Sequence, residues 1–308
     1  MTTSFEHVSV ELRPGTVVCG RWHGNAYRIE RVAGRGATAT VYAAWGPMGR
    51  VALKVAADEA CVLVEAVTLR DLEARGAALG PFLRDVDEAD IGGRPVLFLA
   101  LDWVEGVPLN RFSFGRRPEV AAAVLEQILD VLERLHAAGL VFGDLKPANV
   151  LVAPGSPPRA GVVDFGGVTP QGRLVRAHSE LYDRAAWGAG GRTADPAYDL
   201  FAAALTFLAA VIGEARLAAF FNRKRSVAAL CDIIRADSRL APYRPVLEPA
   251  LHGRWASAGA MRRALAAASD AGLSAVPPRD RLTAGLVGAC AVAVAWFLLA
   301  SAAWWERQ

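Results

Sequence analysis

The stretch VFGDLKPANVLV, residues 141–152, places a carboxylate, an ammonium and an amide close together at Asp144, Lys146 and Asn149. A second acid follows in the tripeptide Asp-Phe-Gly at 164–166. Carboxylate and amide oxygens are ligands that Mg²⁺ accepts, and a carboxylate can take a proton from a hydroxyl group. Each fragment alone fits an ordinary loop, so its meaning depends on the rest of the chain.

Two motifs precede this stretch. The segment GRGATATV, residues 34–41, is a glycine-rich turn inside a strand-turn-strand pattern over 27–45, so it predicts a hairpin and excludes a dinucleotide-binding turn that opens a helix. Lys54 lies on the next predicted strand, residues 50–56, and Glu65 lies on a helix predicted over 59–76. If that helix packs on the sheet, Glu65 can pair with Lys54 and direct its ammonium toward phosphate oxygens.

The composition limits the class of protein. The chain has 308 residues, is 53% hydrophobic and carries a formal net charge of +3, and its basic residues are spread along the sequence instead of forming a nucleic-acid-binding cluster. The four cysteines are far apart without metal-site spacing, which indicates free thiols. Of the 34 basic residues, only Lys54, Lys146 and Lys224 are lysines. Two of them lie in the motifs above, which suggests a need for a compact ammonium there.

The order of the predicted elements indicates two lobes of different class. Strands dominate the first part of the chain, and helices predicted over 117–139 and 198–213 follow them. We therefore predict an α+β fold with a mostly β N-terminal lobe at 25–104, a mostly α C-terminal lobe at 105–272, and a crevice between the lobes. Residues 1–24 are assigned to an N-terminal extension.

Residues 282–305 predict a transmembrane helix. The run contains no charged residue and ends with Trp304 and Trp305, which are typical of a membrane interface. A short linker at 273–281 precedes it, and more arginines flank the run before it than after it, which places the bulk of the chain on the cytoplasmic side. We expect a single-pass C-terminal anchor in the cytoplasmic (inner) membrane; the alternative is a buried C-terminal core helix.

The glycine-rich hairpin, the strand lysine, the helix glutamate, the loop at 144–149 and the tripeptide at 164–166 follow one another in a fixed order. This order resembles the bacterial Hanks-type serine/threonine protein kinases over roughly residues 25–270. DLKP at 144–147 resembles serine/threonine kinases more than tyrosine kinases or small-molecule kinases. The resemblance implies a bilobal protein-kinase-like fold that uses ATP and Mg²⁺ to phosphorylate Ser and Thr hydroxyls of proteins.

A closer likeness lies in residues 12–29, 142–152 and 180–202, which resemble the YabT-type tail-anchored kinases of spore-forming bacteria. The likeness implies a membrane-tethered kinase with cytoplasmic protein substrates. Some members carry a long basic stretch before the anchor, whereas this chain has only the short linker, so nucleic acid is not indicated as a partner. Whether the chain forms a homodimer is left open.

The resemblance implies a role for each site residue. Asp144 accepts the hydroxyl proton and Lys146 neutralises charge on the transferred phosphoryl group. The implied catalytic residues are Asp144, Lys146, Lys54 and Glu65, and the implied metal ligands are Asn149 and Asp164. The implied nucleotide-binding residues are Gly34, Gly36, Ala39, Val41, Ala52, Lys54, the gatekeeper Leu101, and the hinge residues Asp102 and Val104. Asp199 matches the buried aspartate that supports the catalytic loop.

Phe142 and Gly143 depart from the family, which has His and Arg at these positions. Phe142 can pack on Phe165, with Leu69 continuing the apolar column, so the packing role of the histidine is retained. Gly143 has no side-chain donor with which to bind a phosphate. We therefore expect a non-RD kinase whose activation segment, residues 167–187, is not switched by a phosphate that docks on the catalytic loop.

A second departure is RAAW, residues 184–187, where the family has Ala-Pro-Glu. The glutamate of that motif makes an ion pair that anchors the activation segment. No acid replaces it in this chain, so we expect the substrate platform to be affected more than the chemistry. Thr169 and Ser179 remain open to autophosphorylation, and His136 is interpreted as a structural residue at a helix end.

The sequence leaves two alternatives to a serine/threonine kinase. The first is a pseudokinase that serves as a scaffold at the membrane, but the retention of Lys54, Asp144 and Asp164 argues against it. The second is a small-molecule kinase on the same fold, which Gly143 favours weakly and Lys146 disfavours.

Overall fold

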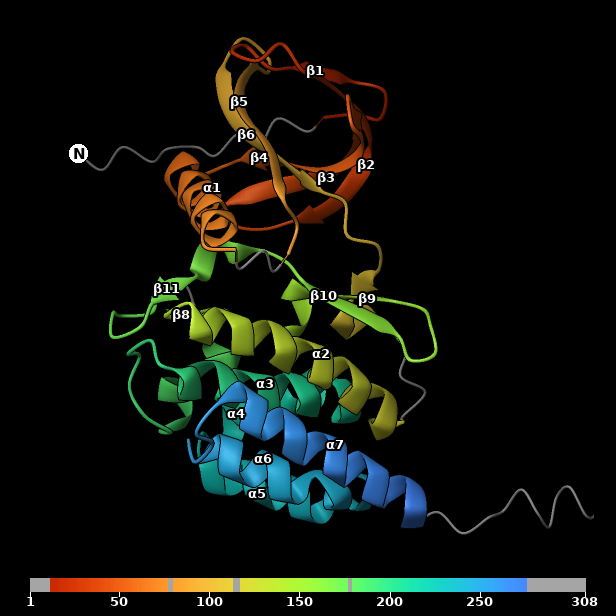
Figure 1. Ribbon diagram of the computed structural model, residues 1–308, viewed down its shortest axis with the longest axis vertical. Helices are drawn as coiled ribbons and strands as arrows, with labels where there is room; N and C mark the ends of the chain where they lie inside the picture. The colour runs from red at the N-terminus through yellow and green to blue at the C-terminus, as the bar shows by residue number, and fades with distance from the viewer. Residues whose placement is uncertain (1–11, 77–79, 113–116, 177–178, 276–308) are drawn as a thin grey trace, which may run out of the picture.

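The computed structural model describes residues 12–76, 80–112, 117–176 and 179–275, which form a strand-rich lobe and a helical lobe (Figure 1). The strand-rich lobe is a six-stranded antiparallel sheet in the order β1-β2-β3-β4-β6-β5, with one helix, α1, beside it. Its elements are β1 (Val17–Cys19), β2 (Ala26–Arg35), β3 (Ala39–Gly46), β4 (Gly49–Ala56), α1 (Glu59–Ala74), β5 (Leu83–Asp90) and β6 (Pro95–Asp102).

The helical lobe follows β6 and is built around long helices joined by short strands and 3₁₀ turns (Figure 1). Its helices are α2 (Pro118–Ala137), α3 (Pro196–Ile212), α4 (Glu214–Arg223), α5 (Val227–Ala236), α6 (Arg244–Leu251) and α7 (Ala258–Ala275). Its strands are β7 (Val107–Pro108), β8 (Leu140–Val141), β9 (Val150–Ala153), β10 (Arg159–Val162) and β11 (Thr169–Pro170). The 3₁₀ turns are η1 (Leu109–Arg111), η2 (Pro147–Asn149), η3 (Phe165–Gly167), η4 (Glu180–Tyr182), η5 (Arg184–Trp187) and η6 (Ser238–Tyr243).

Helix α1 places one polar residue on its buried face. The helix begins at Asp58, whose carboxylate caps it by accepting a hydrogen bond from the backbone N–H of Cys61 at 3.2 Å. Val62, Leu69 and the other apolar residues of the same face are buried against the sheet. Glu65 lies on that face as well, so the spacing of the apolar residues turns its carboxylate toward β4.

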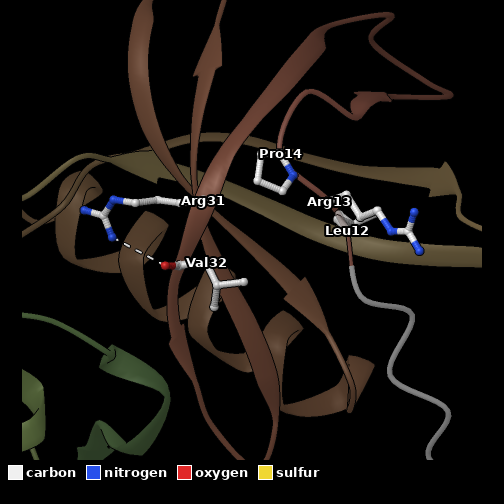
Figure 2. Close-up of a pocket in the computed structure, with 5 residues that line it drawn as sticks. All are labelled: Leu12, Arg13, Pro14, Arg31 and Val32. Carbon is white, nitrogen blue, oxygen red and sulfur yellow. Dashed lines mark hydrogen bonds between the residues drawn. The ribbon is translucent and has the colours of Figure 1, made fainter.

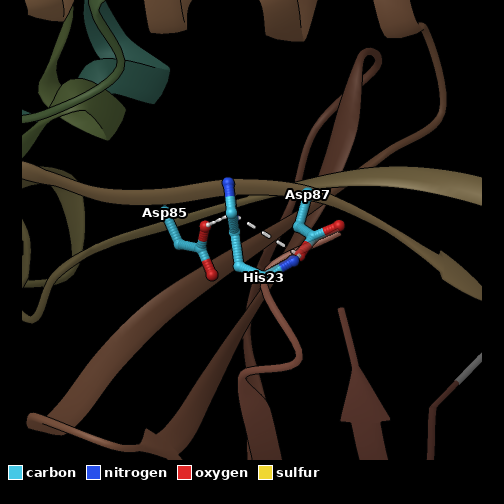
Figure 3. A group of neighbouring side chains, drawn as sticks. All are labelled: His23, Asp85 and Asp87. Atoms are coloured by element: carbon cyan, nitrogen blue, oxygen red, sulfur yellow. Dashed lines mark hydrogen bonds and ion pairs between the residues drawn. The ribbon is translucent and has the colours of Figure 1, made fainter. Parts of the chain in front are cut away.

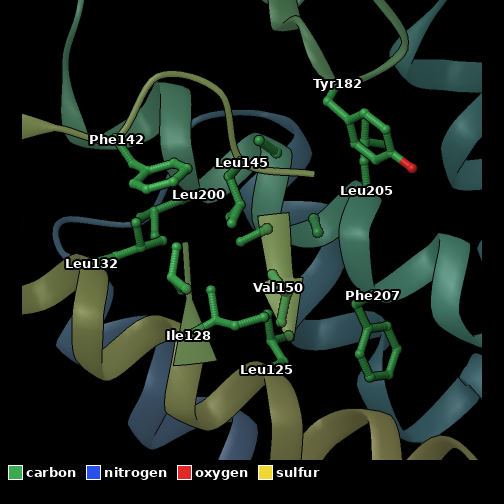
Figure 4. Close-up of a cluster of buried hydrophobic side chains, with 14 of the residues drawn as sticks. Leu125, Ile128, Leu132, Phe142, Leu145, Val150, Tyr182, Leu200, Leu205 and Phe207 are labelled. Carbon is green, nitrogen blue, oxygen red and sulfur yellow. The ribbon is translucent and has the colours of Figure 1, made fainter. Parts of the chain in front are cut away.

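Apolar packing in the helical lobe supports the catalytic loop from below (Figure 4). Helix α3 is apolar nearly all round and is buried on almost every face, as its sequence predicts. Residues from α2, the loop after β8 and α3 meet in one cluster, and each fully buried Leu or Phe contributes about 1.5–3 kcal/mol relative to exposure. The cluster in Figure 4 includes Leu125, Ile128, Leu132, Phe142, Leu145, Val150, Leu200 and Leu205.

The long predicted elements are confirmed: α1, α2 and α3 lie within one or two residues of the helices predicted from periodicity. Three details differ. Strand β1 belongs to the six-stranded sheet although it lies in the range assigned to the N-terminal extension, 1–24. Strand β5 was not predicted, because its inward positions hold Asp85 and Asp87 where apolar residues are expected. Helix α7 continues to Ala275, into the range predicted as a linker, 273–281.

The buried acids of β5 hold the loop between β1 and β2 (Figure 3). Asp87 accepts hydrogen bonds from the backbone N–H groups of Trp22 at 2.9 Å and His23 at 2.8 Å, and Asp85 accepts one from Tyr27 Oη at 2.7 Å. Burial would raise the pKa of Asp87, but these backbone donors outweigh it, so the pKa lies below its ordinary value. Potential metal-ligand atoms of His23, Asp85 and Asp87 lie within 4.8 Å of one another. Protein donors already engage both carboxylates, so the group connects β5 to the loop by hydrogen bonds.

The predicted transmembrane helix, 282–305, lies outside the described residues. Among the residues that the structure does describe, no single helix has the length and hydropathy needed to cross a membrane. Helices α3 and α4 meet that test only as a pair, and the pair is bent by 118° at its junction.

A cavity of 290 Å³ lies in the strand-rich lobe, between the first described residues and β2 (Figure 2). Its lining residues are Leu12, Arg13, Pro14, Arg31 and Val32. Arg31 donates to the backbone carbonyl of Val32 at 3.4 Å across one side of it. None of the predicted site residues lines this cavity.

Candidate active site

A lysine of the sheet joins the two lobes through ion pairs. Lys54 Nζ on β4 lies 2.5 Å from Glu65 Oε2 on α1 and 2.8 Å from Asp164 Oδ1, so the predicted pair forms and a second acid joins it. Burial would lower the pKa of Lys54, but the charges of Glu65 and Asp164 outweigh it and raise the pKa above its ordinary value. The ammonium is therefore charged at neutral pH and fixed at the boundary between the lobes.

The catalytic loop forms a second polar group opposite the first. Lys146 Nζ donates to Asp144 Oδ2 at 2.6 Å, and Asn149 Nδ2 donates to the backbone carbonyl of Asp144 at 2.9 Å. Ser179 of the activation segment also reaches this loop, because its Oγ lies 3.2 Å from Asp144 Oδ1 and accepts from Lys146 Nζ at 3.0 Å. The structure thus brings together the three predicted loop residues and adds Ser179 to them.

Asp199, in the first turn of α3, holds the backbone of this loop. Its carboxylate is fully buried and accepts hydrogen bonds from the backbone N–H groups of Phe142 at 2.7 Å and Gly143 at 2.9 Å. His136 Nε2, near the end of α2, lies 2.9 Å from the same carboxylate. Asp199 therefore has the supporting role that the sequence implied, and His136, interpreted only as a helix-end residue, shares it.

The aromatic packing expected at the catalytic loop is present. The rings of Phe142 and Phe165 meet edge to face, with centroids 5.5 Å apart and an interplanar angle of 82°, and both side chains are fully buried. Leu69 is buried in the same cluster. On the other side of Phe165 lies Gly80, where an added Cβ would stand 2.7 Å from the ring. Phe142 thus fills the place of the family histidine, and Gly80 leaves the room that Phe165 needs.

Gly143 occupies a position that a larger residue would strain. Its φ is +82°, and an added Cβ would lie 2.7 Å from the carbonyl oxygen of Gly167 and 3.3 Å from Val175 Cγ1. A left-handed φ favours glycine, and backbone atoms cannot yield as a flexible side chain can. The departure from arginine therefore removes a phosphate ligand and also permits close contact between the catalytic loop and the start of the activation segment.

The predicted nucleotide-binding residues lie on neighbouring strands above the catalytic loop. Val41 on β3 pairs with Lys54, and Ala52 on β4 pairs with Leu101 on β6. The hairpin between β2 and β3 is closed by a hydrogen bond from the N–H of Gly36 to the carbonyl of Ala39 at 2.9 Å. Gly34 lies at the end of β2 in the same hairpin, and Asp102 and Val104 lie where β6 leaves the sheet. The carboxylate of Asp102 is engaged by Arg84 at 2.5 and 3.0 Å, and its backbone N–H donates to the carbonyl of Phe82 at 3.0 Å.

The two predicted metal ligands, Asn149 and Asp164, lie in adjoining segments. The N–H of Val163 donates to the carbonyl of Asn149 at 2.9 Å, which holds the segment before Asp164 next to the catalytic loop. Asp164 has a φ of +66°, and its side chain is 44% exposed although it pairs with Lys54. Asn149 uses its amide nitrogen to bind Asp144, so its amide oxygen remains the ligand end. A carboxylate and an amide oxygen at this place fit Mg²⁺.

The segment at 184–187 has other contacts where the family glutamate is missing. Trp187 is 1% exposed and packs on Phe221 of α4 with centroids 5.0 Å apart. Its Nε1 also donates to the carbonyl of Leu181 at 2.8 Å. Tyr182 Oη donates to Glu214 Oε1 at 2.7 Å on the same helix. Apolar packing and hydrogen bonds on α4 therefore anchor the segment in place of the missing ion pair.

Protein kinases are the class of enzymes in which a lysine–glutamate pair of a strand-rich lobe faces the aspartates of a helical lobe, and this geometry places the chain in that class. No family model matches the chain. The serine/threonine-protein kinase YabT of Bacillus subtilis is 33% identical over 287 residues, which cover 92% of this chain and 82% of the relative. The chain belongs to the family of bacterial serine/threonine protein kinases.

Two further relatives agree with this assignment. The serine/threonine-protein kinase PkaB of Streptomyces coelicolor is 36% identical over 155 residues, which cover 46% of this chain and 37% of the relative. The serine/threonine-protein kinase PknA of Mycobacterium tuberculosis is 30% identical over 219 residues, which cover 66% of this chain and 49% of the relative. The expectation drawn from the motifs is thereby confirmed at the level of the family.

Proposed function

We propose that the chain is a serine/threonine protein kinase that transfers the γ-phosphoryl group of ATP to Ser and Thr hydroxyls of cytoplasmic proteins. The observation that carries the proposal is the position of Lys54, paired at once with Glu65 on α1 and Asp164 below it. This double pairing requires the two lobes to be closed on each other with the helix turned inward. The names of the relatives, all serine/threonine kinases, support the same activity.

Each step of the transfer has a residue in place. Lys54 neutralises nucleotide phosphate oxygens while Glu65 keeps it oriented. Asp144 accepts the proton of the substrate hydroxyl, and Lys146, 2.6 Å from it, offsets the negative charge on the phosphoryl group as it moves. Asn149 and Asp164 would hold Mg²⁺, which supplies further positive charge at the phosphates.

The proposal is tested by incubating the purified full chain with γ-labelled ATP and myelin basic protein, with Mg²⁺ or with excess EDTA. We expect labelled phosphoserine or phosphothreonine in the acceptor, and no label when the metal is chelated. A parallel set of small hydroxyl compounds examines the small-molecule alternative. ATP binding without transfer to any acceptor would contradict the proposal and favour a pseudokinase scaffold.

The same site supports activity that does not depend on a phosphorylated activation segment. Gly143 offers no donor for a phosphate, and the segment is held by Trp187 and Tyr182 instead. We predict that protein treated with a broad phosphatase, then freed of it, keeps its initial rate within about twofold, because no docked phosphate is lost. Initial rates are measured before the enzyme can relabel itself. A loss of tenfold or more that recovers on incubation with ATP would show that a phosphate switch exists.

We also propose that residues 282–305 anchor the kinase to the cytoplasmic membrane. The support is the uncharged run with its terminal tryptophans. The full chain is expected to remain with phosphatidylglycerol-containing vesicles after an alkaline wash. Val294→Arg places a charge near the middle of the run, at a cost of roughly 2.5–3.5 kcal/mol or more, and should weaken this retention. Equal retention of both proteins would argue for peripheral binding.

A further inference from the structure

The end of the activation segment is joined to the start of α3 by a buried arginine. Arg184 donates from Nη1 and Nη2 to the two carboxylate oxygens of Asp195, both at 2.7 Å. Its Nε donates to the carbonyl of Gly191 at 2.8 Å, and Nη2 also donates to the carbonyl of Thr193 at 3.2 Å. The side chain is only 10% exposed. The carboxylate of Asp195 is 42% exposed, so the pair is shielded on the arginine side only. A bidentate arginine–carboxylate pair adds geometric specificity as well as strength to a hydrogen bond between charged groups.

A second ion pair crosses the loop from 183 to 195. Asp183, which is fully buried, accepts from Arg192 Nε at 2.8 Å and from Tyr198 Oη at 3.1 Å. It also accepts from the backbone N–H of Ala185 at 3.0 Å. Asp183 and Arg184 are adjacent, and their partners Arg192 and Asp195 both lie at the far end of the loop, so the two pairs together close the loop from 183 to 195 against the start of α3.

Asp195 links this loop to the catalytic loop. Its carboxylate caps α3 by accepting from the backbone N–H of Tyr198 at 3.0 Å. Asp199, the residue after Tyr198, accepts hydrogen bonds from two backbone N–H groups of the catalytic loop. At its other end the activation segment meets the catalytic loop through Ser179 and Asp144. Residues 179–184 are therefore held at one end by the catalytic loop, through Ser179, and at the other end by the first turn of α3, through Arg184.

We propose that Arg184 is a positioning residue for phosphotransfer, whose ion pair with Asp195 holds residues 179–187 in place as a platform for the protein substrate. This inference rests on the proposed kinase function and deepens it. This ion pair adds to the contacts that Trp187 and Tyr182 make on α4, so the platform is held without a docked phosphate in the unphosphorylated chain. Arg184 touches neither nucleotide nor reacting atoms, so it acts on substrate binding and not on the chemical step.

The test uses the full chain with Asp195→Asn and Arg184→Gln. Asparagine caps a helix as well as aspartate does, so Asp195→Asn removes the charge of the pair and keeps the cap of α3. Arg235→Gln is the matched control, because Arg235 also pairs with an acid, Glu248, but its side chain is 54% exposed and it lies on α5. For each protein we would measure KM for myelin basic protein, KM for ATP, ATP hydrolysis without acceptor, and amide hydrogen exchange over 183–195.

Both variants of the pair should raise KM for the protein acceptor about tenfold and speed exchange in the loop, while KM for ATP and ATP hydrolysis stay within about twofold. The double variant should be no worse than the more affected single one, because both remove the same contact. An unchanged acceptor KM in both variants, or equal losses of hydrolysis and transfer with a lower melting temperature, would overturn the inference. Absence of transfer by the unaltered chain would instead refute the kinase function itself.

Discussion

Replacing Asp144 with asparagine is expected to lower kcat for phosphotransfer by about 10³-fold, because the general base is lost while the shape of the side chain is kept. The carboxylate receives hydrogen bonds from Lys146 at 2.6 Å and lies 3.2 Å from Ser179 Oγ. An amide in its place turns an NH₂ group toward one of these donors or leaves one of them without an acceptor. The loop should nevertheless fold, since Asp199 and not Asp144 holds its backbone.

The measurement is kcat and KM for both substrates, with folding monitored by thermal unfolding. KM for ATP should stay within about twofold, because Lys54 and Asp164, the proposed contacts of the nucleotide and its metal ion, are untouched. Asp130→Asn serves as the control for the same chemical change: Asp130 forms exposed ion pairs with Arg134 and Arg262 far from the catalytic loop. Retention of more than a tenth of kcat in Asp144→Asn would mean that Asp144 positions the hydroxyl without taking its proton.

The parts of the site that sequence predicted are those in which short motifs carry both chemistry and geometry. The pairing of Lys54 with Glu65 follows from a strand that carries the lysine and a helix whose apolar face includes the glutamate. The contact of Phe142 with Phe165 follows from replacing one ring by another of similar size. In both cases the local pattern fixes the direction of the side chain, and the fold class fixes its partner.

Other parts depend on contacts that no local pattern encodes. Strand β5 escaped prediction because Asp85 and Asp87 face inward, where they accept hydrogen bonds from Tyr27 on β2 and from the loop before it, 58 and 64 residues earlier in the chain. The ion pair of Arg184 with Asp195 also joins residues of a loop without periodicity. A buried arginine cannot be told from an exposed one by composition, so RAAW was interpreted only as the loss of an acid. The packing of Trp187 on Phe221 could not be predicted either, because the two residues are far apart in the sequence.

Substitution of Gly143 is expected to have the second large effect on activity. Restoring the arginine of the family at this position should not restore regulation by phosphate. Gly143→Ala or Gly143→Arg should reduce activity instead of creating a phosphate switch, because any Cβ would lie 2.7 Å from the carbonyl oxygen of Gly167. The left-handed φ of +82° alone costs about 1–2 kcal/mol for a residue with a Cβ. The close approach to backbone adds to this cost and pushes the catalytic loop away from the segment after Asp164.

Gly172 allows the cost of the backbone angle to be separated from the cost of the close contact. It has the same φ of +82°, but an added Cβ there would meet nothing within 4 Å. Gly172→Ala should therefore lower the free energy of unfolding by about 1–2 kcal/mol, whereas Gly143→Ala should lower it by about 2–4 kcal/mol, through strain and collision together. Displacement of Asp144 by a fraction of an ångström should also reduce kcat for Gly143→Ala by roughly tenfold or more. Equal stability losses in the two variants would mean that the contact with Gly167 relaxes freely and that glycine at 143 serves only its backbone angle.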